Sequence, residues 1–423
     1  LASICIFLTI SQTFFQNNLF TLCHLIYTDT FYMKRKWIRW VSWILLTPII
    51  LFVILMVLLY VPPVQNLLRR EVTAYASKAT GMQIQVERID LRFPLNLLVR
   101  GVEVIQQPDT LLSLESLNVR VQAWPLIKGK VEVDEVTLSR VAVNSANLME
   151  GMKIKGVLGR FFLQSHGVDL SNEIAIINQA ELSDTHVQLL MNDTTTTPKD
   201  TTASAPVNWK VDLHQLKLKN VSFSMQLPVD SMRMAAHIGE AAIDDAQADL
   251  KNQFYGLKKF LLSGTSASYD TGTAQPIEGF DASHIAVRDV RIALDSLLYK
   301  GRDMNAVIRE FTMNERSGLS VVSLTGRAYS NDSIISVPGL KLKTPHSEID
   351  LSAHTYWELV NIPTTGRLSA NLNAYIGKED VMLFAGGLPD SFKEAYPFRP
   401  LVIRAGTDGN LKQMQISRFT VDL

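Results

Sequence analysis

A two-residue alternation of apolar and polar side chains constrains the fold of this chain more than any other feature. The clearest example is residues 209–227, "WKVDLHQLKLKNVSFSMQL". Such alternation is typical of β-strands with one apolar face and one wet face. Its phase slips at His214-Gln215 and at Lys219-Asn220, which predicts bulges or tight turns there. The apolar stripe consists of Val211, Leu213, Leu216, Leu218, Val221, Phe223, Met225 and Leu227.

The same pattern recurs at irregular spacing, which favours a repetitive, additive β-structure over one closed core. If the copies are aligned on Asn220, Arg140 and Asp289 fall at the same step in two further copies. A weaker copy surrounds Asp184, and a partial one surrounds Gly101. The stripes of the two stronger copies are Val131, Val133, Val136, Leu138, Val141 and Val143, and Phe280, Ala282, Ile285, Val287, Val290, Ile292 and Leu294.

Two segments interrupt the strand pattern, and the chain ends inside a further copy of it. Residues 147–164 have mixed helical periodicity, and we expect a short helical insertion there. Residues 192–208 are rich in Thr, Ser and Pro, and we expect an exposed loop. The final "MQISRFTVDL" repeats the stripe, so we expect this sequence to be the N-terminal part of a longer protein.

Residues 33–63 have the organisation of a membrane anchor. Val41 to Val61 is an uncharged run of 21 residues, which as a helix is about 31 Å long, close to one bilayer core. A basic cluster precedes the run and is expected to stay in the cytoplasm, which places the rest of the chain on the other side. The basic residues are Lys34, Arg35, Lys36 and Arg39, and the expected anchor residues include Trp40, Val41, Ile44, Leu51, Ile54, Leu58 and Val61.

Residues 1–32 contain no Lys or Arg, so they lack the positive segment of a secretory signal. We interpret them as an upstream extension translated from a start placed too early; the alternative is a genuine hydrophobic hairpin or leader. Both cysteines, Cys5 and Cys23, lie in this segment. If Met33 is the true start, disulfides and thiolate chemistry are excluded.

Residues 64–81 predict an amphipathic helix, with a glycine cap at Gly81. Two interpretations stay open: a helix that rests on the membrane or gates an opening, and a helix that caps the first strands. From residue 82 to residue 423 we expect the repetitive β region.

Nothing in the sequence predicts an enzyme, a cofactor or a metal site. Lys plus Arg and Asp plus Glu each number 41, and the absence of a basic excess argues against a nucleic-acid-binding protein. The stretch "GMKIKGVLG" lacks the Lys and Ser or Thr that a phosphate-binding loop requires. The histidines, among them His186, His214 and His284, form no ligand motif, and we expect surface or edge positions for them.

The apolar stripes therefore carry the functional hypothesis. A one-sided sheet must cover its apolar face, either with a second sheet, as in a sandwich, or by curling into a groove. A groove of this kind would accept acyl chains, because each buried methylene contributes about 0.8 kcal/mol. The candidate lipid-groove residues are Val131, Val133, Leu138, Val141, Val143, Val211, Leu213, Leu216, Leu218, Val221, Phe223, Met225, Ile285, Val287, Val290, Ile292 and Leu294.

The order of elements after the anchor resembles the AsmA-like superfamily, and within it the TamB proteins of Gram-negative bacteria. The resemblance is clearest from Met33 to Asn144, where the anchor is followed by "TGMQIQVERIDL", "LLVRGVEVIQ" and "LLSLESLNVRVQAWPLIKGKVEVDEVTLSRVAVN". It implies a single-pass inner-membrane anchor and a long, curved, taco-like β-groove in the periplasm with an apolar interior. It also implies phospholipid transport towards the outer membrane.

The resemblance leaves a second function open, a scaffold for assembly of outer-membrane proteins with an Omp85-type barrel as partner. In the family that contact lies in a C-terminal domain beyond this sequence. An envelope adhesin with a sandwich fold is a third hypothesis.

Overall fold

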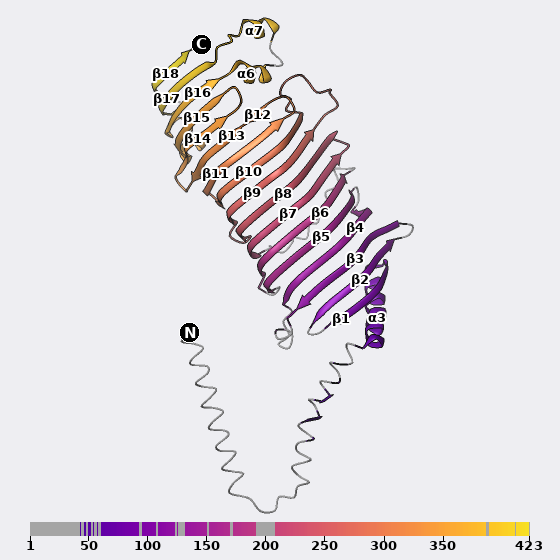
Figure 1. Cartoon of the computed structure of the whole chain (residues 1–423). Helices are drawn as coiled ribbons and strands as arrows, with labels where there is room; N and C mark the ends of the chain where they lie inside the picture. The colour runs from indigo at the N-terminus through magenta and orange to yellow at the C-terminus, as the bar shows by residue number, and fades with distance from the viewer. Residues whose placement is uncertain are drawn as a thin grey trace, which may run out of the picture. The chain divides into compact units, whose positions relative to one another are not determined.

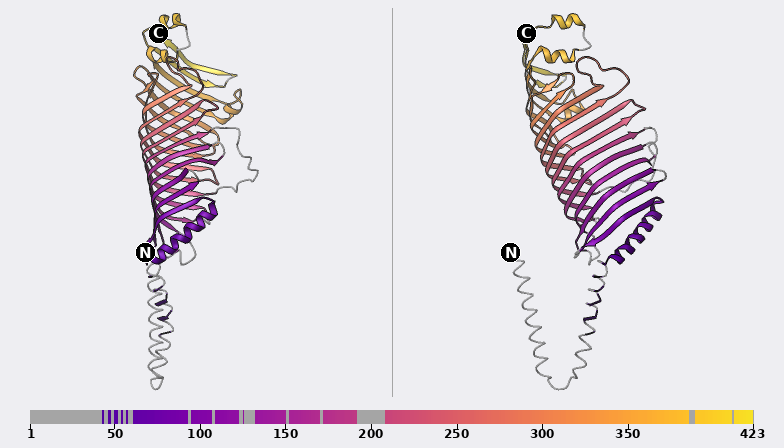
Figure 2. Two further views of the ribbon diagram at one scale, coloured as in Figure 1. Left: turned by 90° about the vertical axis from the view of Figure 1, so that its right-hand side faces the viewer. Right: turned by 45° about the vertical axis from the view of Figure 1, so that its right-hand side comes forward.

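Consecutive strands lie side by side, so the sheet is built in the order of the chain (Figure 1). The computed structural model describes residues 43, 46–47, 50–51, 54, 57, 61–92, 95–106, 109–122, 125, 132–149, 152–169, 172–191, 208–385, 389–410 and 412–422. These residues form a mainly β structure with 18 strands in one open, curved sheet, whose curvature Figure 2 shows from two further directions.

The elements follow one another as a long series of strands with few helices. The strands are β1 (Gln83–Arg92), β2 (Asn96–Gln106), β3 (Asp109–Val121), β4 (Val133–Met149), β5 (Met152–Asp169), β6 (Ile174–Met191), β7 (Lys210–Leu227), β8 (Met232–Asp249), β9 (Phe254–Asp270), β10 (His284–Lys300), β11 (Asp303–Glu315), β12 (Ser320–Val321), β13 (Ser323–Ser330), β14 (Ile334–Lys343), β15 (Glu348–Tyr356), β16 (Leu368–Ile376), β17 (Leu401–Gly409) and β18 (Met414–Asp422). The helices are α3 (Pro62–Thr80), α5 (Trp357–Asn361), α6 (Lys378–Phe384) and α7 (Asp390–Ala395).

The chain divides into two compact units, residues 1–64 and 65–423, and the sheet belongs to the second. Its strands pair antiparallel with their neighbours along the chain, apart from β6 and β7, which run parallel. Antiparallel neighbours need only a short turn, whereas a parallel pair needs a connection that returns to the starting end of the strand. That connection contains the predicted loop at 192–208, of which residues 192–207 lie outside the described residues.

The prediction of a mainly β chain with a curved sheet is confirmed, and the sandwich alternative is wrong for the part of the chain that the structure describes. All its strands belong to a single sheet. Among the elements whose bounds the structure describes, the short helices α5, α6 and α7 interrupt the strands between β15 and β17.

The predicted helical insertion at 147–164 is wrong. The described residues of this range, 147–149 and 152–164, belong to β4 and β5, and β5 pairs with β4 and β6 along its length. The apolar residues Leu158, Phe161 and Leu163 are three and two residues apart, which suggested a helical period. This spacing arises because the strand changes phase at Gly159, which the ladder with β6 skips.

A line of left-handed backbone crosses the sheet at the predicted phase steps. The strands do not reverse at these residues; each strand continues with a kink, so the alternative of tight turns is wrong. The ladders on both sides keep one register and skip the kinked residue, as between Ser183–Lys219 and Thr185–Val221. We call this line the crease, and its residues are Gly101 (φ 58°), Arg140 (φ 46°), Asp184 (φ 50°), Asn220 (φ 53°) and Gly264 (φ 60°).

The crease explains why the apolar stripe keeps to one side of the sheet. A left-handed residue resets the pleat, so Leu218 and Val221 share a face although they are three residues apart. The kinked strands β2, β4, β6, β7 and β9 all run in one direction. Up to β6 the kink lies in even-numbered strands, and from β7 it lies in odd-numbered strands, since β6 and β7 run parallel. In β10, Asp289 also has a positive φ of 54°, at a shift of register with β9.

The predicted stripe of the downstream copy begins too early. Phe280 and Ala282 precede β10, which starts at His284. Phe280 instead packs against Phe384 of α6, with ring centroids 5.2 Å apart.

Helix α3 lies along the outer edge of β1 (Figure 1). It ends in the predicted glycine cap: Gly81 has φ +69°, and its N–H donates to Ser77 O at 3.0 Å. Its side chains hydrogen-bond to free backbone groups of β1, for example Gln65 Nε2 to Leu91 O at 3.0 Å. The helix thereby covers an edge that would otherwise be open to pairing with another chain.

Most of the predicted anchor lies outside the described residues. This applies to Trp40, Val41, Ile44 and Leu58, and to the basic residues Lys34, Arg35, Lys36 and Arg39. Leu51 and Ile54 are helical and exposed, and Val61 directly precedes α3. Within the part of the chain that the structure describes, no helix has both the length and the apolar character that crossing a membrane requires.

The crease residue Gly264 allows a test of whether left-handed backbone is required there. Gly264→Ala is expected to reduce the free energy of unfolding by about 1 kcal/mol, because an L-residue is disfavoured at positive φ. The new methyl group has room, since the nearest atom, Gly239 Cα, lies 3.7 Å from the Cβ position. Urea unfolding followed by circular dichroism measures the change.

The matched control is Gly339→Ala in β14. Its Cβ would meet nothing within 4 Å, and its φ is not in the left-handed region. We expect no loss, or a gain of about 0.5 kcal/mol from the smaller entropy of the unfolded chain. Equal losses in the two variants would contradict the role of left-handed backbone at the crease.

Candidate functional site

The ladder registers align the apolar stripes of successive strands into rows that cross the sheet. Leu138 of β4 pairs with Phe161 of β5, Phe161 pairs with Leu182 of β6, and Leu182 pairs with Leu218 of β7. Residues directly opposite each other in a ladder point to the same side of the sheet. One apolar surface therefore extends from β4 to β7.

The same row continues on the other side of β7. Leu218 pairs with Ala241 of β8, Ala241 pairs with Leu262 of β9, and Leu262 pairs with Ile292 of β10. Beyond β10, Ile292 pairs with Phe311 of β11. The row also reaches β1 through Leu117, Val99 and Ile89.

The structure places the described candidate residues on this one surface. We call it the apolar face, and it comprises these residues and their cross-strand partners from β1 to β11. Val131 lies outside the described residues. The others are Val133, Leu138, Val141 and Val143 in β4, Val211, Leu213, Leu216, Leu218, Val221, Phe223 and Met225 in β7, and Ile285, Val287, Val290, Ile292 and Leu294 in β10.

Three intervening strands contribute residues that the sequence reasoning missed. In β5 the phase step gave the appearance of a helix. In β8 the signal is weak because alanines occur on both faces, and in β9 the step at Gly264 was not aligned with the others. The missed residues include Leu158, Phe161 and Leu163 of β5, Ile238 and Ile243 of β8, and Phe260 and Leu262 of β9.

Large side chains of the apolar face are in contact with solvent. Phe223 is 41% exposed, Met234 37%, Tyr255 42%, Leu297 39% and Tyr299 43%. Neighbouring aromatic rings contact each other across the strands, as Tyr255 and Tyr299 do with centroids 6.1 Å apart. Among the described elements, no second sheet and no helix packs across this face, and an extended apolar surface of this kind indicates a binding function.

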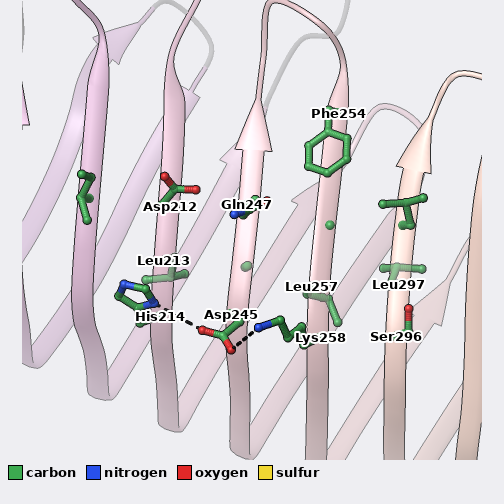
Figure 3. Close-up of a pocket in the computed structure, with 14 residues that line it drawn as sticks. Asp212, Leu213, His214, Asp245, Gln247, Phe254, Leu257, Lys258, Ser296 and Leu297 are labelled. Atoms are coloured by element: carbon green, nitrogen blue, oxygen red, sulfur yellow. Dashed lines mark hydrogen bonds and ion pairs between the residues drawn. The ribbon is translucent and has the colours of Figure 1, made fainter.

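The opposite, polar side of the sheet carries a pocket of about 470 Å³ over β6 to β10 (Figure 3). Asp212, Gln247 and Gly256 form one cross-strand row in it. Beside them, Asp245 Oδ1 lies 3.3 Å from His214 Nδ1, and its Oδ2 lies 3.0 Å from Lys258 Nζ.

The side chains of His214, Asp245 and Lys258 bind one another. The hydrogen bond from Lys258, and next the one from His214, hold the pKa of Asp245 below its ordinary value. Asp245 also has a positive φ of 50°, at a second interruption of the β7–β8 ladder opposite His214. Since this cluster already pairs its own charges, we place the candidate functional site on the apolar face.

The prediction that the histidines are surface or edge residues is wrong for His284. It is 7% exposed, and its Nδ1 lies 2.8 Å from Asp281 Oδ2. The N–H groups of Ile277 and then Ser283 donate to the Asp281 carboxylate and lower its pKa. The sequence shows only the spacing of these residues; the loop between β9 and β10 buries them.

The described residues include no group of three or more His, Cys, Asp or Glu that could hold a metal ion. No family model and no curated protein matches the chain. The functional proposal therefore depends on the geometry of the apolar face together with the order of the sequence elements.

The cluster in Figure 3 allows a test by titration. Lys258→Met is expected to raise the pKa of Asp245 towards its ordinary value, and His214→Gln is expected to raise it less, because the Lys258 hydrogen bond is the larger cause. Side-chain carboxyl ¹³C NMR measures both values.

The lowered pKa also fixes the direction of the dependence of stability on pH. Ionised Asp245 stabilises the fold above the pKa of the unfolded chain, and this contribution is lost as the pH falls through the lower pKa of the folded state. An Asp245 pKa that does not change in the Lys258→Met protein would contradict the assignment.

Proposed function

We propose that this protein conducts phospholipids along a groove formed by the apolar face of its curved sheet. The observation that carries the proposal is the continuity of that face from β1 to β11, with large side chains left exposed. Acyl chains suit such a surface, because transfer of each methylene from water contributes about 0.8 kcal/mol. Binding of this kind needs no specific polar group and no catalytic residue.

The shape of the sheet supports a path for movement rather than a single binding site. Rows of paired residues repeat from strand to strand at about 4.8 Å, so neighbouring positions along the rows offer similar surroundings. A ligand tail can therefore shift by one strand without crossing a polar barrier, as between Leu182, Leu218 and Ala241.

The cellular setting in the proposal comes from the sequence. Residues 33–63 anchor the chain in the inner membrane of a Gram-negative bacterium, with Lys34, Arg35, Lys36 and Arg39 in the cytoplasm. The sheet then lies in the periplasm, and phospholipids pass between the inner and outer membranes. The resemblance to the AsmA-like superfamily and its TamB proteins supports this setting.

Photocrosslinking tests the proposal on both sides of one strand. A photoreactive amino acid at Phe223 on the apolar face is expected to capture phospholipid in cells. Ser224, the next residue of β7, points to the polar side and provides the matched control. Mass spectrometry of the captured species measures the difference, and equal capture at the two positions would contradict the proposal.

A charge on the apolar face tests transport itself. Val221→Asp is expected to block phospholipid transfer while the protein still accumulates, because a carboxylate repels acyl chains and is costly to desolvate. Ser222→Asp, on the polar side, is expected to leave transfer unchanged. Normal transfer with the Val221→Asp protein, together with reduced levels of outer-membrane proteins, would favour the scaffold function instead.

A further inference from the structure

Helix α3 turns its polar side chains towards the sheet. Gln65, Arg69, Thr73 and Ser77 follow one another at four-residue spacing, so they share one side of the helix. Arg69 Nη1 donates to Glu87 O at 2.8 Å and to Val86 O at 3.2 Å.

Ser77 and Thr73 complete the contact between α3 and β1. Ile84 N donates to Ser77 Oγ at 3.1 Å, and Thr73 Oγ1 is buried. The polar side of α3 is therefore occupied by the free edge of β1.

The apolar side chains of α3 are consequently left in solvent. Leu67 is 58% exposed, Val72 45% and Tyr75 77%. At 100° per residue, Val72, Tyr75 and Ala79 lie within about 60° of one another, and Tyr75 lies opposite Asn66. This arrangement is the reverse of an ordinary surface helix, which buries its apolar stripe against its own domain.

Tyr75 and Lys78 on this side of the helix suit the interface of a lipid bilayer. Lys78 lies eleven residues after Leu67, which places both at the same angle around the helix. Glu71 lies between Leu67 and Tyr75 around the helix, and Arg70 lies about 140° from Tyr75, so the exposed side carries one basic and one acidic residue, Lys78 and Glu71. Tyrosine and long basic side chains are favoured where hydrocarbon meets anionic headgroups.

We propose that the exposed side of α3, formed by Leu67, Val72, Tyr75 and Ala79, lies in the surface of a lipid bilayer. The position in the chain supports this occupant: α3 begins at Pro62, directly after the uncharged run that ends at Val61. The inference rests on the proposed membrane anchor, but not on lipid conduction by the sheet.

Bound in this way, α3 has two partners at once. Its polar side holds the backbone of β1, and its apolar side holds the bilayer, so the helix fixes the first strand of the sheet at the membrane surface. A flexible tether at residue 61 would set no such orientation.

Quenching of a fluorescent label tests the inference in the full chain. Cys5 and Cys23 are replaced by Ser, and a single cysteine carrying an environment-sensitive dye is introduced as Tyr75→Cys. Asn66→Cys is the matched control, because Asn66 is exposed although it lies on the side of the helix that carries Thr73 and Ser77. The proteins are reconstituted in vesicles that contain about 30% phosphatidylglycerol in phosphatidylcholine.

The dye at position 75 is expected to be quenched by acyl-chain doxyl lipids and to show a several-fold lower iodide quenching constant than the dye at position 66. Adding Val72→Glu to the Tyr75→Cys protein is expected to raise the iodide constant to the level at position 66. Val72 is exposed, so the circular dichroism spectrum should not change. If this variant fails to fold, Leu67→Gln replaces it.

Equal iodide quenching at positions 66 and 75, without quenching by doxyl lipids, would overturn the inference. A second result would also overturn the inference: in detergent, the dye at position 75 becomes more protected from iodide as the protein concentration rises. This result would assign the exposed side of α3 to a second copy of the chain. Phospholipid capture at Phe223 is measured separately, so failure of the membrane contact and failure of lipid conduction give different results.

Discussion

Main-chain hydrogen bonds between neighbouring strands hold the sheet together, because one layer cannot bury a core between two layers. Few residues are fully buried, and many of those on the apolar face are small, such as Ala175, Ala180 and Ala241. The larger apolar side chains cover their neighbours within the row and stay partly open to water. Cohesion is therefore local, since each strand depends on the two strands beside it.

The crease adds a constraint to these ladders. Its residues Arg140, Asp184 and Asn220 adopt positive φ without being glycine, and so does Asp289 of β10. Such residues cost about 1 kcal/mol or more each, and the ladders on both sides over-determine their conformation. Side-chain contacts support the line, as where Asn220 Nδ2 donates to Asp184 Oδ1 at 2.7 Å.

Much of the fold could be predicted from the sequence because alternation and phase steps are local signals. The aligned step at Asn220 led to Arg140 and Asp289, and all three have left-handed backbone. The pairing of strands was not predictable in this way, because register depends on contacts between residues far apart in the chain. For the same reason the parallel pair β6–β7 and the burial of His284 by its loop left no local signal.

The candidate site was predictable in its chemistry but not in its extent. The stripe of β7 identifies Val221 and Phe223 on one side of the strand, and the ladders then add β5, β8 and β9 to the same face. The orientation of α3 was undecided because its sequence contains both a polar and an apolar stripe. Hydrogen bonding decided it: the free edge of β1 needs donors and acceptors, and the apolar stripe offers none.

The parallel pair β6–β7 also has a consequence for how the chain folds. It separates two meanders, β1–β6 and β7–β18, in each of which hairpins can form between strands adjacent in sequence. Contacts within each meander are short in sequence and can form early, whereas the β6–β7 seam joins two preformed sheets edge to edge. Synthesis on the ribosome would therefore deliver the first meander as a separate folding module, whose β6 edge templates the second.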